Sequence, residues 1–154
     1  SLAICEYVSE KYLNGGGWPE DIVKRGVARS CAAEMHSDFF DLRKEMPMNC
    51  RATGRKVGIT DALQRDIFRI DQIWTELRSK HSKDGPWLFG TFSIADCMFA
   101  PVVFRFVTYG VSVSAESNEY ISTSLSHEMM QKWLSEAKEE KDIIENEEVG
   151  LQFV

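Results

Sequence analysis

The stretch Phe92-Ser93-Ile94-Ala95-Asp96 decides the fold, because it predicts where a buried helix begins. Ser93 is suited to the N-cap, and the carboxylate of Asp96, three residues later, can accept free backbone N–H groups of the first turn. The same carboxylate suits the positive end of the helix dipole. The next residues are apolar on nearly every face: Met98, Phe99, Ala100, Val102, Val103, Phe104, Phe106 and Val107. Such a helix lies at the centre of a fold.

Helical periodicity recurs on both sides of this segment, and alternating strand patterns are almost absent. We predict one long helix over 19–46, which opens at Pro19 and ends at Pro47. Its apolar stripe is Val23, Val27, Cys31, Met35, Phe39, Leu42 and Met46. We predict a second long helix over 59–81, with Thr60 as its N-cap. Its stripe is Leu63, Ile67, Ile70, Trp74 and Leu77.

Three shorter helices are predicted over 1–13, 115–124 and 128–137. The breaker Asn14-Gly15-Gly16-Gly17 ends the first of them. The fold class that follows is all-α: a helical bundle around a central buried helix that starts at Ser93.

Composition limits the class of protein. Of the 154 residues, 44% are hydrophobic and 27% are charged, which is typical of a domain with a real core. No apolar run approaches the roughly 18 residues of a membrane span, so no membrane partner is expected. The net charge of −6 argues against non-specific binding of nucleic acid. Seven acidic and two basic residues in 136–148 carry −5 of that charge, and we predict a frayed, solvated helix end there.

The cysteines indicate neither a disulfide framework nor a metal site. Cys5, Cys31, Cys50 and Cys97 form no CxxC pair, and none has zinc-ligand spacing to a histidine. We therefore expect no metal and a reducing, cytoplasmic location, and no signal peptide pattern is present. Because Ser1 enters a helix directly, we expect the chain to be a C-terminal piece of a longer protein.

Three motifs resemble those of cytosolic glutathione S-transferases. Ser1-Leu2-Ala3-Ile4 resembles the Ser-x-Ala-Ile that closes the glutathione-binding half of these enzymes. The segment 92–96 resembles the N-capping motif of the central helix in their C-terminal domain. Residues 34–39, Glu-Met-His-Ser-Asp-Phe, are similar to a Glu-Leu-His-x-x-Phe stretch of the bacterial beta class.

The resemblance runs from Ser1 to about Ala137 and implies a domain division. Residues 1–13 would be the last helix of a missing thioredoxin-like domain, and 14–18 a linker. Residues 19–137 would be the helical C-terminal domain, with 138–154 as an acidic tail outside the resemblance.

The resemblance also implies roles for three polar residues. Ser1 would bind the γ-glutamyl carboxylate of glutathione, His36 would contact its thiolate as an auxiliary catalytic group, and Glu34 would reach glutathione bound to a neighbouring subunit. The residues alone leave plainer interpretations open: a chain end, a boundary histidine and a solvated helix charge.

Aromatic and basic residues complete the candidates. The resemblance favours Phe106 as a wall of an electrophile pocket, with Phe39, Phe40 and Tyr109 as further candidates, although aromatics at helical spacing are often core. A basic cluster could select an anionic co-substrate, or could be a solvated loop. Its members are Arg43, Lys44, Arg51, Arg55 and Lys56.

The function implied is that of the electrophile-binding and dimerising domain of a detoxifying enzyme. The complete protein would be a homodimer that conjugates glutathione, as co-substrate, to a hydrophobic electrophile, and this chain alone would be inactive. The alternative is a non-catalytic glutathione-transferase-like module for protein assembly. An apolar residue at the thiol-contact position of the missing domain would favour that module. A third possibility is an unrelated helical bundle. It requires the match between Phe92–Asp96 and the family's N-capping motif to be accidental.

Overall fold

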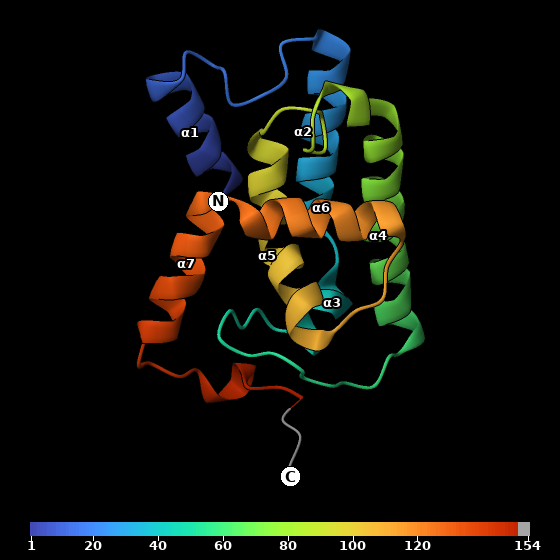
Figure 1. Ribbon diagram of the computed structural model, residues 1–154, viewed down its shortest axis with the longest axis vertical. Helices are drawn as coiled ribbons and strands as arrows, with labels where there is room; N and C mark the ends of the chain where they lie inside the picture. The colour runs from blue at the N-terminus through green and yellow to red at the C-terminus, as the bar shows by residue number, and fades with distance from the viewer. Residues whose placement is uncertain (151–154) are drawn as a thin grey trace.

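The computed structural model describes residues 1–150, which form helices and loops with no named strand (Figure 1). The α-helices within this range are α1 (Leu2–Tyr12), α2 (Ile22–Ser37), α3 (Phe40–Glu45), α4 (Asp61–His81), α5 (Ile94–Tyr109), α6 (Ala115–Ser126) and α7 (Glu128–Glu139). Two short 3-10 helices, η1 (Ser82–Asp84) and η2 (Glu145–Glu147), complete the described elements. The predicted all-α class is therefore confirmed.

Helix α5 is the central element, as the sequence predicts. It packs against α2 and α6, while α4 packs against α3 and α6 (Figure 1). The centre of the core is aromatic: the Trp74 ring on α4 lies 5.7 Å from Phe99 and 5.4 Å from Phe106, both on α5. Tyr120 on α6 closes this group, with its ring centroid 4.9 Å from that of Trp74. Rings at such separations stabilise one another beyond simple burial.

The predicted capping box fixes the start of α5. One carboxylate oxygen of Asp96 accepts the backbone N–H of Ser93 at 2.9 Å and the Ser93 hydroxyl at 3.1 Å. The other oxygen accepts the backbone N–H of Leu88 at 3.2 Å, so the same side chain also holds the preceding turn. Burial raises the pKa of Asp96, and the bonds from Leu88 and Ser93 oppose that rise.

The apolar stripe predicted for the helix over 59–81 is also confirmed. Thr60 caps α4 and accepts the backbone N–H of Leu63 at 3.2 Å. All five stripe residues, Leu63, Ile67, Ile70, Trp74 and Leu77, are buried. A stripe spaced three and four residues apart packs α4 lengthwise against its neighbours.

The prediction of a single helix over 19–46 is wrong, because the structure divides this range into α2 and α3. Helix α2 begins at Ile22 rather than at Pro19; Asp21 caps it, and its side chain accepts the backbone N–H of Lys24 at 2.8 Å. The chain breaks at Phe39, which takes the left-handed conformation with φ 60°. The backbone N–H of Leu42 then donates to Asp66 on α4, so a tertiary bond satisfies the first turn of α3.

Helix α1 joins the bundle through a tight loop. The buried Gly17 donates its N–H to the Ser9 hydroxyl at 3.0 Å and accepts the N–H of Ile94 at 2.8 Å. A Cβ at Gly17 would lie 2.7 Å from the Ser9 oxygen and 2.8 Å from the Ile94 side chain. Gly17 therefore packs closely between α1 and the start of α5, whereas Gly15 and Gly16 are exposed.

We predict that Asp96→Ala destabilises the chain by about 2–4 kcal/mol, because it removes a cap and leaves buried N–H groups of Leu88 and Ser93 without an acceptor. Urea unfolding followed by circular dichroism measures the loss. Asp61→Ala is the matched control. Asp61 is an exposed carboxylate in the first turn of α4, so this substitution should lower the free energy of unfolding by less than about 1 kcal/mol. Equal unfolding midpoints for the two variants would contradict the prediction.

Candidate functional site

The three polar residues expected to contact glutathione lie on the surface and do not converge on one cavity. Ser1 is exposed at the N-cap of α1, where its side chain makes no capping bond. His36 is exposed in the last turn of α2, and its backbone oxygen accepts Arg43 at 3.2 Å. Ser1, Glu34 and His36 line none of the four cavities described below.

Glu34 is engaged within the chain. Its two carboxylate oxygens accept the Arg69 guanidinium from α4 in a bidentate arrangement, at 2.6 and 2.9 Å. The Glu34 partner raises the pKa of Arg69, as expected for a charge-assisted pair. Any ligand that reaches Glu34 would meet this pair rather than a free carboxylate.

The four aromatic candidates differ in their surroundings. Phe106 is 2% exposed and contacts Trp74 in the core, whereas Phe40 is 69% exposed on α3. Phe39 is buried at the break between α2 and α3. Tyr109 is buried as well, and its hydroxyl donates to the carbonyl of Pro47 at 3.2 Å. Only Tyr109 lines one of the four cavities, a hollow of about 270 Å³ beside the loop 56–59.

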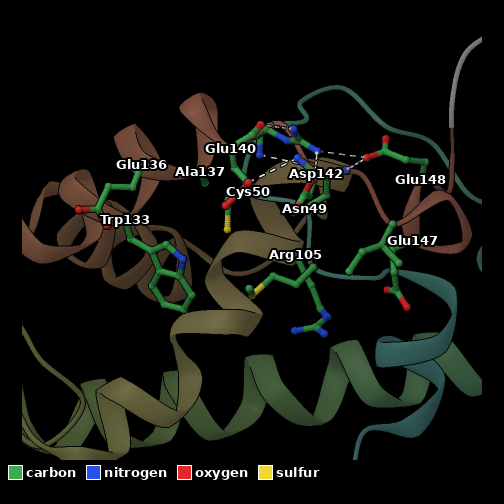
Figure 2. A pocket seen from close by; sticks show the side chains of 13 residues that line it. Asn49, Cys50, Arg105, Trp133, Glu136, Ala137, Glu140, Asp142, Glu147 and Glu148 are labelled. Carbon is green, nitrogen blue, oxygen red and sulfur yellow. Dashed lines mark hydrogen bonds and ion pairs between the residues drawn. The ribbon is translucent and has the colours of Figure 1, made fainter.

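The largest of the four cavities, which we call the polar cavity, lies between α5, α7 and the loop 48–51. Its volume is about 530 Å³, within the range of ligand-binding pockets. Figure 2 shows Trp133 on one side and Glu147 and Glu148 on the other, with Arg105 between them. The full lining is Met48, Asn49, Cys50, Arg51, Arg105, Trp133, Glu136, Ala137, Glu140, Asp142, Ile144, Glu147 and Glu148.

One wall of the polar cavity is the segment 140–150, which we call the acidic strap. The Arg51 guanidinium donates to the carbonyls of Glu140 at 2.7 Å and Asp142 at 3.3 Å. Glu148 forms an ion pair with Arg55 and accepts the Asn49 amide at 2.8 Å. Nearly all of 136–148 is exposed, as the sequence predicts for a solvated helix end. The sequence did not predict that the strap folds back onto the loop that carries Arg51 and Arg55.

Sequence reasoning missed Arg105. Its Nε donates to the carbonyl of Met46 at 2.9 Å and its Nη1 to that of Pro101 at 3.1 Å. Among residues 1–150 it has no ion-pair partner. Burial, and then the nearby charge of Arg43, lower its pKa, while Glu147 opposes the change. The available signal was a single basic residue within the otherwise apolar helix of 97–107.

A second, apolar surface covers α1, the start of α5 and α7; we call it the apolar face. Two cavities open there, with volumes of about 310 and 240 Å³. Cys97 and Phe92 line both of them. Its exposed side chains are Ile4, Val8, Leu13, Phe92, Met129 and Trp133.

No helix within residues 1–150 is long and apolar enough to cross a membrane. No group of three or more histidine, cysteine, aspartate or glutamate side chains in that range could hold a metal ion.

Residues 59–135, half of the chain, match the family described as "Glutathione S-transferase, C-terminal domain". The chain belongs to this family. Its fold is similar to a solved structure of a glutathione transferase homologue from Burkholderia, strain BGR1, with bound glutathione. The TM-score is 0.66 at 24% identity, over 91% of this chain and 67% of that one. No curated protein sequence matches the chain.

The family match places the glutathione S-transferase C-terminal core on the elements from α4 to α7. It includes the capping box of α5 and the buried aromatic group around Trp74. The acidic strap and the Arg51–Arg55 loop lie outside the matched range.

We predict that Phe106→Ala lowers the free energy of unfolding by about 3–5 kcal/mol, the cost typical of a buried phenylalanine. Phe40→Ala, the control on the exposed side chain, should change it by less than about 0.5 kcal/mol. Urea titration of both variants measures the difference. A Phe106 variant as stable as the control would show that this ring forms a pocket wall rather than part of the core.

Proposed function

We propose that this glutathione-transferase-like chain is the electrophile-binding half of an enzyme whose thioredoxin-like domain precedes it. In the proposed reaction, the thiolate of glutathione attacks an electrophilic carbon and forms a carbon–sulfur bond. A leaving group departs with its electron pair, or a proton completes an addition. The observation that carries the proposal is the family membership of residues 59–135.

The apolar face supports the presence of a second domain. Exposed apolar side chains and two cavities meet there on α1, α5 and α7. Contiguous apolar patches on a folded domain usually mark a surface that another protein part covers. A thioredoxin-like domain docked on this face would cover the patch and would lie next to the N-terminus of α1.

The proposed roles of the polar residues follow from the resemblance. Ser1, at the start of α1, would bind the γ-glutamyl carboxylate with help from the helix N-terminus. His36 would donate to the thiolate of glutathione and favour its charged form. Glu34 would contact glutathione in a neighbouring subunit as a Glu34–Arg69 pair.

The aromatic residues and the outer helix faces support the remaining parts of the proposal. Tyr109 and the exposed Phe40 would contact the hydrophobic electrophile, while Phe39 and Phe106 would support its pocket from within the core. A homodimer would use α2 and α4, which expose Val23, Val27 and Phe68. The four unpaired cysteines fit a reducing, cytoplasmic location.

One observation favours the alternative function, a non-catalytic module for protein assembly. Ser1, Glu34 and His36 line none of the four cavities, and Glu34 is already paired. The residue at the thiol-contact position of the proposed preceding domain discriminates the two functions. Serine, cysteine or tyrosine there would favour the enzyme, and an apolar residue would favour the module.

We predict that residues 1–154 alone do not conjugate glutathione, because two or three surface contacts cannot offset the freedom that a flexible tripeptide loses on binding. The complete reading frame should conjugate glutathione to chlorodinitrobenzene, whereas the isolated chain should not exceed the buffer rate. Calorimetric titration with glutathione gives a second readout. Turnover by the isolated chain, or no turnover by the complete protein, would contradict the proposal.

We also predict that the isolated chain self-associates through the apolar face. The double substitution Ile4→Lys and Val8→Lys places two charges on exposed positions of α1 and should shift the chain towards monomer. Sedimentation velocity at several concentrations measures the shift. Glu10→Lys with Lys11→Glu, which leaves the net charge of α1 unchanged and its apolar residues in place, is the control and should behave as the parent.

A further inference from the structure

We propose that Cys5 on α1 and Cys97 on α5 form a redox-active pair, which a peroxide oxidises to a disulfide that fastens α1 to the start of α5. Both thiols are free in the structure. The oxidant class is hydrogen peroxide or an organic hydroperoxide. This inference rests on how α1 and α5 lie against each other, so it does not depend on the proposed conjugation of glutathione.

The register between α1 and α5 brings the two cysteines to the same level. The helices run in opposite directions (Figure 1). Ser9 and Ile94 flank one point, because a Cβ at Gly17 would lie 2.7 Å from the Ser9 oxygen and 2.8 Å from the Ile94 side chain. Cys5 lies about one helical turn before Ser9, and Cys97 lies about one turn after Ile94. One turn further along two antiparallel helices, the residues of the facing sides meet again.

An apolar cavity lies between the two helices, and both cysteines line it. Its volume is about 240 Å³, and Ile4, Val8 and Ile94 form part of its remaining wall. Loss of water around the thiol, and then the charge of Cys5, raise the pKa of Cys97 to about 11. Because the effect of one charge on another falls off with distance, this influence agrees with two sulfur atoms that lie near each other.

Helix α1 is held loosely enough for the bond to close. A disulfide needs its two Cα atoms within roughly 7 Å of each other, so its formation would draw α1 onto α5 and reduce the cavity between them. The polar contacts of α1 with the bundle include the Glu6 carboxylate, which accepts the indole N–H of Trp18 at 3.0 Å, and the Ser9 hydroxyl, which accepts the N–H of Gly17 at 3.0 Å. Most residues of α1 are exposed, so a small shift of this helix costs little packing.

The proposed reaction is a two-electron oxidation of the pair. The Cys5 thiolate attacks the peroxide, a sulfur–oxygen bond forms and the oxygen–oxygen bond breaks, and the departing hydroxide or alkoxide takes up the proton that Cys5 released. The Cys97 sulfur then attacks the resulting sulfenic acid. The sulfur–sulfur bond forms, and the oxygen leaves as water with the Cys97 proton. Cys97 acts second because its raised pKa keeps it protonated near neutral pH. In a reducing compartment such a disulfide is transient and senses oxidants.

The test treats the whole chain with hydrogen peroxide, alkylates the remaining thiols with iodoacetamide and maps the tryptic peptides by mass spectrometry. Trypsin separates the four cysteines into different peptides, so each linkage is identified directly. We expect a peptide in which Cys5 is linked to Cys97 and which dithiothreitol cleaves. Because the bond closes a long loop, the oxidised chain should unfold at a temperature about 5–10 °C higher than the reduced chain.

Matched variants keep the test specific. Cys5→Ser and Cys97→Ser should each remove the linked peptide and the rise in unfolding temperature. Cys50→Ser is the control, since Cys50 is partly buried like Cys5, and it should behave as the parent chain. Linkage of Cys5 or Cys97 to another cysteine, bonds between chains only, or thiols that are oxidised singly without linkage would overturn the proposal. If a serine variant fails to fold, the peptide map and unfolding temperature of the parent chain, oxidised and then reduced again, decide the question.

Discussion

The carboxylate of Asp96 is the interaction on which the rest of this structure depends. It accepts hydrogen bonds from Leu88 and from both the backbone and the hydroxyl of Ser93, although its burial raises its pKa. These bonds fix the direction in which α5 leaves the preceding turn. Because α2 and α6 both pack on α5, an error in that direction would displace the whole bundle. The loop after α1 bonds to the same point, through the Gly17 carbonyl and the Ile94 N–H.

The parts of the fold that sequence reasoning predicted are those whose signals are local. The Ser93 and Thr60 caps each need only residues within three positions, and the α4 stripe needs only a regular spacing. A helix that is apolar on all sides must be central wherever its neighbours lie. These features therefore follow from the chain without knowledge of its tertiary contacts.

The parts that failed depend on distant partners. The apolar spacing continues through Phe39, and no glycine or proline lies at the break, yet α2 ends at Ser37 and the chain turns at Phe39. The Leu42 N–H of the next helix finds its acceptor in Asp66, a partner 24 positions away. The acidic segment 136–148 is largely exposed, as its composition suggests, but composition could not show that Glu148 meets Arg55 across more than 90 positions of sequence. Of the site candidates, the sequence could locate the basic loop but not its partner, and it treated Arg105 as part of an apolar helix.

The two ends of α5 present different chemistry, and this division shapes what each surface can bind. Near Ser93 the surroundings are apolar, with Phe92, Cys97 and the exposed residues of α1, so a large apolar partner such as another domain suits that end. Near Arg105 the cavity combines a half-buried cation with charged and aromatic walls, which suits a small charged ligand. Trp133 lines cavities on both sides. A domain that covered the apolar face would contact this ring directly, so α7 offers a physical connection between domain docking and the shape of the polar cavity.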